Sequence, residues 1–292
     1  MRKNIIIYLF VLIMFTNYYC QTLRQERLNS MINTEYAFAE RAAHVGTRDA
    51  FLEFIADEGI LFRPIPVNGK EFLSKQSSRP GLLSWYPVSA YMSSSGDMGC
   101  TTGPAEFRKY KDSSAIWFGN FCTVWQLQND GKWKFLIDTG NFNDRPGEKI
   151  EGLKINQNFE TGIYLSEKAK PSEKSEIISI DKKFNSTLHQ NSLIESYKKY
   201  VDDDTKLLRE GIFPIIGTDK IFLYYNDIKT DLTFVPIDGN ISNAGDFGYV
   251  YGSLEVNSTG TEPKRKYNYL RMWRKNGDNW KILIEATNSI PQ

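Results

Sequence analysis

The sequence predicts an α+β protein built from two copies of one module. Two stretches of the 292-residue chain share a series of residues about 148 positions apart. Each stretch begins with helix-like apolar spacing and ends in strand-like segments separated by turns. Helices followed by a run of strands are typical of the α+β class. We therefore expect each module to be a curved antiparallel sheet packed on N-terminal helices.

The N-terminus has the pattern of a secretory signal. The basic pair Arg2-Lys3 precedes an apolar stretch over residues 5–15, which is too short to cross a bilayer comfortably. We expect removal of residues 1–20 and an exported mature protein, periplasmic or secreted. A lipid anchor on Cys20 is the less favoured alternative, because the small residues that usually precede a lipidated cysteine are absent. The mature sequence contains no further apolar stretch long enough to predict a transmembrane segment.

The first part of each module has the spacing of an amphipathic helix, with apolar residues at three- and four-residue steps. The matched residues are Glu35, Phe38, Phe51, Phe54, Ile55, Asp57 and Leu61 in the first copy and Asp181, Phe184, Tyr197, Tyr200, Val201, Asp203 and Leu207 in the second. Pro66 and Gly69, like Pro214 and Gly217, are expected to end this helical part in a turn.

The rest of each module predicts strands. The turns Asn129-Asp130-Gly131 and Asn276-Gly277-Asp278 each lie between tryptophan-bearing segments and predict β-hairpins. A colinear series of more than a dozen matches indicates a duplication. The boundaries that follow are residues 24–142 for the first module, 143–172 for a charged linker and 173–292 for the second module.

A more specific pattern surrounds a Gly-Asp-x-Gly run in each copy. Its residues are Gly96-Asp97-x-Gly99-x-Thr101-x-Gly103 with Trp125, Trp133-Lys134 and Asp138 in the first copy, and Arg209-Glu210-Gly211, Gly245-Asp246-x-Gly248-Tyr249-x-Tyr251-Gly252, Trp273 and Trp280-Lys281 in the second. Both copies resemble the domain of unknown function 4440, in the SnoaL-like branch of the nuclear transport factor 2-like (NTF2-like) superfamily. The resemblance covers about residues 28–142 and 174–290. It implies two cone-shaped modules, each with a cavity at its wide end, but no particular reaction.

Asp97 and Asp246 are the candidate catalytic residues. The isomerases of the superfamily that the chain resembles place a carboxylate base in an apolar cavity. A Gly-Asp-x-Gly run is also how a chain forms a tight turn, with the aspartate bonded to nearby backbone. The sequence favours this structural role and leaves the catalytic one open.

Five residues are candidates for binding a ligand: Tyr249, Tyr251, Trp273, Trp125 and Thr102. The tyrosines have hydroxyls that can donate into a pocket, and the tryptophans can form cavity walls. For the tyrosines and tryptophans, the sequence favours packing in the core and leaves ligand binding open. Because the tyrosines have no tyrosine equivalents in the first copy, the two pockets are expected to differ, with the second favoured as the functional one.

Cys100 and Cys122 are predicted to form a disulfide. If their strands form one hairpin centred on Lys111, the two cysteines are directly opposite each other, at a separation that a disulfide can bridge. Export to an oxidising compartment would allow the bond. The alternative is two buried thiols that pack as small apolar side chains.

Composition narrows the possible partners. The formal net charge is +1 and no basic stripe is interleaved with aromatic residues, so nucleic acid is not expected. No metal-ligand spacing or phosphate-binding loop occurs, and we expect neither metal nor cofactor. The leading hypothesis is a protein that binds a small apolar molecule in a cone cavity. The alternatives are a cofactor-free isomerase, cyclase or hydrolase, and an intramolecular pseudo-dimer with filled cavities.

Overall fold

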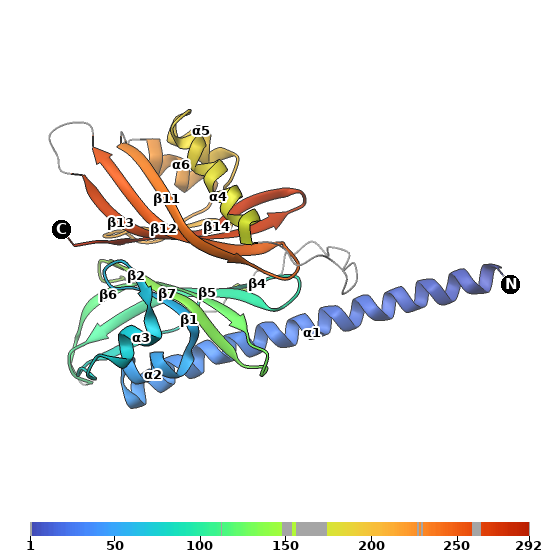
Figure 1. Ribbon diagram of the computed structural model, residues 1–292, viewed down its shortest axis with the longest axis horizontal. Helices are drawn as coiled ribbons and strands as arrows, with labels where there is room; N and C mark the ends of the chain where they lie inside the picture. Colours follow the sequence, from blue (N-terminus) through green and yellow to red (C-terminus); the bar gives the residue numbers. More distant parts are fainter. Residues whose placement is uncertain are drawn as a thin grey trace.

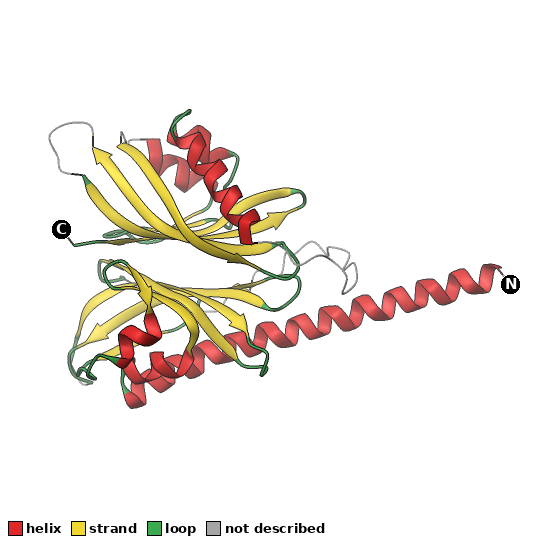
Figure 2. Cartoon of the chain, viewed as in Figure 1, coloured by secondary structure: helices red, strands yellow, loops and turns green. Residues whose placement is uncertain are grey.

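The structure, a computed structural model, consists of two sheets that face each other, with helices on their outer sides (Figure 1). It describes residues 2–111, 113–147, 154–155, 174–226, 228, 230–258 and 264–291. The first module runs from α1 to β7 and the second from α4 to β14. Figure 2 shows the segregation of helix and strand within each module that defines the predicted α+β class.

The first module begins with three helices interrupted by two short strands and ends in long strands. Its elements are α1 (Arg2–Val45), α2 (Thr47–Phe54), β1 (Ile55–Phe62), β2 (Pro66–Asn68), α3 (Gly69–Ser74), β3 (Leu82–Trp85), β4 (Ser89–Met92), β5 (Met98–Arg108), β6 (Ala115–Leu127) and β7 (Trp133–Asn143). The strand order is β2-β1-β7-β6-β5-β4-β8, with β3 beside β5. Strand β8 (Lys154–Ile155) comes from the predicted linker and pairs with β4.

The second module repeats this plan. Its elements are α4 (Lys174–Leu188), α5 (Leu193–Lys198), β9 (Lys206–Leu208), β10 (Ile215–Ile216), α6 (Thr218–Asn226), β11 (Thr230–Ile241), β12 (Phe247–Ser258), β13 (Arg265–Asn276) and β14 (Asn279–Ser289). The strand order is β10-β9-β14-β13-β12-β11. Both predicted hairpin turns are confirmed, with Gly131 and Gly277 at positive φ between the strands they join.

Helical structure predicted through Leu61 is wrong beyond Phe54, because Ile55–Phe62 forms β1. This strand runs parallel to β7, as β9 runs parallel to β14, so the sheets are mixed rather than antiparallel. Apolar spacing of three and four also fits a strand with an irregularity, which β1 has between Ile55 and Ile60. Pro66 and Gly69 do not end the helical part, since they begin β2 and α3.

A core of equivalent residues lies between the two sheets. The first module contributes Met98, Cys100, Cys122, Val124, Leu136 and Ile137, and the second contributes Phe247, Tyr249, Leu270, Met272, Leu283 and Ile284. Two further cores lie between each sheet and its own helices, around Phe38 in the first module and Phe184 in the second. The two modules therefore bury corresponding faces of their sheets against each other.

Cys100 and Cys122 are both free and buried, and no disulfide joins them. The predicted register, which placed them opposite each other, is wrong. Cys100 pairs with Val124, and Cys122 pairs with Thr102. A shift of one residue in the centre of a hairpin moves every partner by two positions, so an approximate turn does not fix the register.

Helix α1 is continuous through the predicted signal sequence and extends away from the first module (Figure 1). Within the described residues, no helix is long and apolar enough to span a membrane. The signal, its removal and the lipid anchor on Cys20 stay predictions. Of the predicted linker, residues 148–153 and 156–172 lie outside the described residues.

Candidate functional site

Asp97 and Asp246 lie in equivalent loops where the two modules meet. The Asp97 carboxylate accepts a hydrogen bond from the backbone N–H of Asn243, at 3.0 Å, in the second module. In return, the Asp246 carboxylate accepts one from the backbone N–H of Ser94, at 2.9 Å, in the first. Each carboxylate also accepts hydrogen bonds from serine hydroxyls of its own loop. These contacts are those of the structural role, and a catalytic role for either residue stays a prediction.

The glycines of the shared motif are required by close strand packing. A Cβ added to Gly103 would lie 2.1 Å from the carbonyl oxygen of Tyr86, and one added to Gly252 would lie 2.1 Å from that of Val235. Any side chain at these positions would force neighbouring strands apart. The recurrence of the motif in both copies therefore has a structural cause.

Tyr249 and Tyr251 are buried on the face of the second sheet that packs against the first module. The ring centroids of Tyr251 and Phe62 are 6.3 Å apart. Thr102 is also buried, and its hydroxyl donates to the backbone carbonyl of Phe121 at 2.5 Å. The role of these three side chains in ligand binding stays a prediction.

Trp125 and Trp273 are fully buried, and each donates its indole N–H to a buried carboxylate. The acceptor of Trp125 is Glu35 of α1, at 3.0 Å, and the acceptor of Trp273 is Asp181 of α4, at 3.1 Å. The duplication had aligned the two acids without assigning them a role. The signal that could have found them is an acidic residue on an otherwise apolar helix face, in both copies.

The Glu35 carboxylate accepts hydrogen bonds from three neutral side chains. Besides Trp125, the indole of Trp85 donates to it at 2.6 Å and the hydroxyl of Thr101 donates at 2.5 Å. Burial raises the pKa of Glu35, and the hydrogen bonds offset part of that rise. No arginine or lysine forms an ion pair with Glu35 among the described residues.

Asp138 of β7 is the second acid on the concave face of the first sheet. It pairs with Thr123 of β6, whose hydroxyl donates to its carboxylate at 2.7 Å. Burial raises the pKa of Asp138 to about 7, and the charge of Glu35 adds to the rise. The Thr123 hydrogen bond and the charge of Arg63 act in the opposite direction. The first module thus holds two carboxyl groups that resist ionisation.

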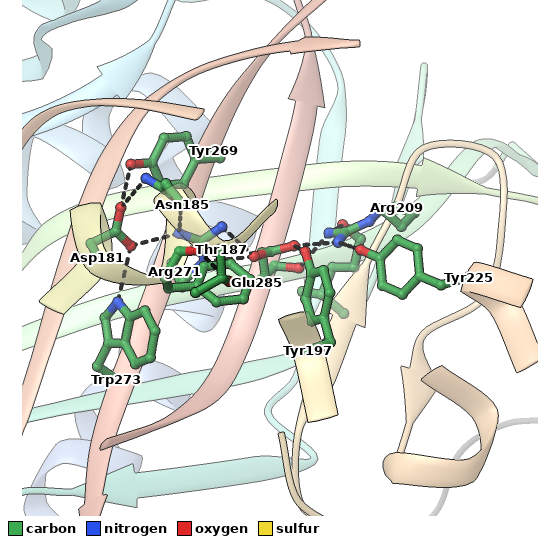
Figure 3. Close-up of polar contacts among 12 residues, drawn as sticks. Asp181, Asn185, Thr187, Tyr197, Arg209, Tyr225, Tyr269, Arg271, Trp273 and Glu285 are labelled. Carbon is green, nitrogen blue, oxygen red and sulfur yellow. Dashed lines mark hydrogen bonds and ion pairs between the residues drawn. The ribbon is translucent and has the colours of Figure 1, made fainter. Parts of the chain in front are cut away.

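The second module has acids at the same two positions but pairs them with arginines (Figure 3). Arg271 of β13, the equivalent of Thr123, donates to Asp181 at 2.6 Å and to Glu285 at 2.6 Å. Arg209 forms a second ion pair with Glu285. Burial opposes ionisation of Glu285, but the charges of Arg271 and Arg209 outweigh it and hold the pKa of Glu285 below its usual value.

Arg271 also fills the interior of the second module. Its side chain is fully buried, and its guanidinium lies 4.5 Å from the ring centroid of Phe184 and 4.4 Å from that of Phe234. A guanidinium held between aromatic rings gains cation–π attraction in addition to its ion pairs. The space that an interior ligand would need at this position is occupied by protein.

The first module has a pocket of about 390 Å³ between α2, α3, β3 and β5. We call it the arginine pocket; its lining residues are Thr47, Arg48, Phe51, Arg63, Phe72, Leu73, Gln76, Ser77, Arg79, Pro80, Gly81, Leu83 and Phe107. Three lining residues are arginines, none is acidic, and the aromatic and aliphatic side chains form apolar walls. The sequence did not reveal this site, because its residues come from four separate stretches, within residues 47–51, at 63, within 72–83 and at 107.

No family model matches the chain, and no curated protein matches it. Solved structures similar to it include an NTF2-like protein from Cytophaga hutchinsonii (22% identical, 41% of this chain and 100% of that one, TM-score 0.34). A ketosteroid isomerase-like protein from Erwinia carotovora atroseptica is 21% identical over 41% of this chain and 99% of its own (TM-score 0.35). An NTF2-like protein of unknown function from Shewanella oneidensis is 14% identical over 39% of this chain and 96% of its own (TM-score 0.33). These are similarities of fold over about two fifths of the chain.

Proposed function

We propose that this protein is a tandem NTF2-like protein whose first module binds a small, largely apolar molecule. The observation that carries the proposal is the arginine pocket, with its volume of about 390 Å³. Small-molecule sites are typically clefts of about 300–1,000 Å³ with mostly apolar walls and a few polar groups. Phe51, Phe72 and Phe107 supply such walls.

The second module, in this proposal, is the scaffold of an intramolecular pseudo-dimer. Its interior is occupied by Arg271 and the carboxylates that Arg271 pairs with. The face of its sheet opposite its own helices is buried against the first module, and the two aspartate loops are joined by reciprocal hydrogen bonds. Ligand binding is therefore assigned to the first module, rather than to the second, which the sequence favoured.

Native mass spectrometry of the protein purified from its own host tests ligand binding. We expect a retained small molecule on the unmodified protein and its loss from S77W, because Ser77 lines the pocket and an indole there would fill it. The matched control is S186W, which adds the same bulk at an exposed position of α4. Retention of the molecule by S77W would contradict the proposal.

A cofactor-free acid–base enzyme is the second candidate function. The observation that favours it is Asp138, a half-buried residue with a pKa raised to about 7. The charge of Arg63, which lines the pocket, acts on this carboxyl group. A carboxyl group with a pKa near neutrality can both accept and donate a proton at physiological pH. If the retained molecule is a substrate, its C–H positions should exchange with D₂O in the unmodified protein and not in D138N. Equal exchange in both proteins would contradict this role.

Export is proposed from the N-terminal sequence. The basic pair Arg2-Lys3 and the apolar stretch over residues 5–15 support a signal. The intact mass of the protein from host fractions distinguishes the outcomes. A chain that starts at Gln21 in the exported fraction supports removal of a plain signal. A chain that starts at an acylated Cys20 indicates a lipoprotein, and an unprocessed chain contradicts both.

A further inference from the structure

The arginine pocket is lined by three arginines, two of which form no ion pair among the described residues. Of its three arginines, Arg48 already has partners, because it forms an ion pair with Asp49 at 2.6 Å and donates to the backbone carbonyl of Leu73 at 3.1 Å. Arg63 and Arg79 are exposed and have no ion pair with any carboxylate among the described residues. Two arginines therefore line the pocket without an ion pair to a carboxylate of the described residues, and the charge of Asp138 acts on Arg63.

In the second module, the arginine at the position equivalent to Arg63 has a carboxylate partner. Leu61 pairs with Asp138 in the first sheet, as Leu207 pairs with Glu285 in the second, so Arg63 and Arg209 occupy equivalent positions two residues further on. Arg209 is buried and forms an ion pair with Glu285.

Asp138 does not reach Arg63 in the same way. Its side chain is one methylene shorter than that of Glu285, and its carboxylate accepts a hydrogen bond from Thr123. Arg63 donates to the backbone carbonyl of Phe62, at 2.7 Å, and lines the pocket. In the second module, the carboxylate of Glu285 forms an ion pair with Arg209. Arg63 forms no such ion pair among the described residues.

We infer that the ligand of the arginine pocket is a carboxylate attached to an apolar body. Arg63 and Arg79 receive the carboxylate, and the walls formed by Phe51, Phe72 and Phe107 receive the body. A guanidinium binds a planar carboxylate through two parallel N–H···O bonds, which a neutral amide cannot replace. This inference rests on the proposed binding function and adds the chemical class of the ligand.

Binding of 2-naphthoate and 2-naphthamide to the full chain tests the inference, because the two probes share a body and differ in charge. We expect the carboxylate to bind at least about tenfold more tightly in calorimetric titrations. R63Q and R79Q should each reduce that ratio toward one without weakening 2-naphthamide. The matched control is R41Q, which removes an exposed arginine of α1 outside the pocket and should leave the ratio unchanged.

The outcomes separate the two proposals. Equal binding of both probes to the unmodified protein overturns the carboxylate inference and leaves the pocket as an apolar site. Binding of neither probe overturns the proposed binding function itself. A preference for the carboxylate that persists in R63Q and R79Q, or that S77W does not abolish, also overturns the inference, because the anion would then bind elsewhere.

Discussion

The interiors of the two modules contain acidic residues at equivalent positions, but the first module surrounds them with neutral donors and the second pairs them with arginines. In the first module, Glu35 and Asp138 are surrounded by hydroxyl and indole donors, and burial raises the pKa of both. In the second, Asp181 and Glu285 are joined through Arg271, and the pKa of Glu285 is lowered. A buried acid can thus be held by neutral donors, whose hydrogen bonds only partly offset the effect of burial and leave its pKa raised, or by a cation, which favours its ionised form.

One position accounts for most of the difference. Thr123 and Arg271 occupy equivalent places on the central strands, each paired with the acid of the last strand. The arginine forms ion pairs with both acids and fills the interior. The threonine is neutral and donates a hydrogen bond to Asp138, and Arg63 of the same module lines a pocket. The second module therefore has a side chain filling its interior at this position, whereas the first module has a pocket lined by an arginine.

Removal of Arg271 is expected to have the largest effect on stability. R271M leaves Asp181 and Glu285 buried beside each other without their shared cation, so we expect a loss of about 3–5 kcal/mol in the free energy of unfolding. Urea denaturation followed by fluorescence measures the loss. The matched variant in the first module, T123V, removes one hydrogen bond and should cost only about 1 kcal/mol. A larger cost for T123V than for R271M would show that the second interior does not depend on its ion pairs.

Asp138 makes the stability of the first module depend on pH. Its pKa is raised to about 7 in the folded state, so the folded protein binds the proton more tightly than the unfolded chain. The stabilisation is complete below the ordinary aspartate pKa of about 4 and is lost as pH rises through about 7. D138N should flatten this part of the stability profile.

The same experiment has an internal contrast. The pKa of Glu285 is lowered in the folded state, so its contribution is present above the ordinary glutamate pKa and is lost as pH falls through the lowered value. D144N, at an exposed position, is the matched control and should leave the profile unchanged. An unchanged profile in D138N would contradict the raised pKa of Asp138.

The smallest expected effects concern the loops that join the modules. Because Asp97 and Asp246 each accept one backbone hydrogen bond from the other module, D97A and D246A should each cost about 1 kcal/mol, with similar values. Thermal unfolding of both variants, with the exposed turn variant D278A as control, measures the costs. Two very different values would show that the interface lacks the symmetry of its hydrogen bonds.

Local sequence signals predicted the repeating plan and its turns well. The hairpin glycines Gly131 and Gly277 require positive φ, which few other residues adopt at low cost, so each turn is encoded within a few residues. The segment that became β1 was misassigned because its apolar spacing suits a helix and a strand equally well. Its pairing with β7, more than 70 residues away, made it a strand.

The sequence by itself determined that the protein has two copies of one α+β module, because apolar spacing, turn residues and the repeat are properties of the chain. Tertiary structure alone decided which side chains share an environment. Glu35 contacts Trp125, which is 90 residues away in the sequence, and the arginine pocket is lined by residues from four stretches of the chain. Burial and proximity, which set the pKa of a carboxyl group and the charge of a pocket, exist only once those segments pack together.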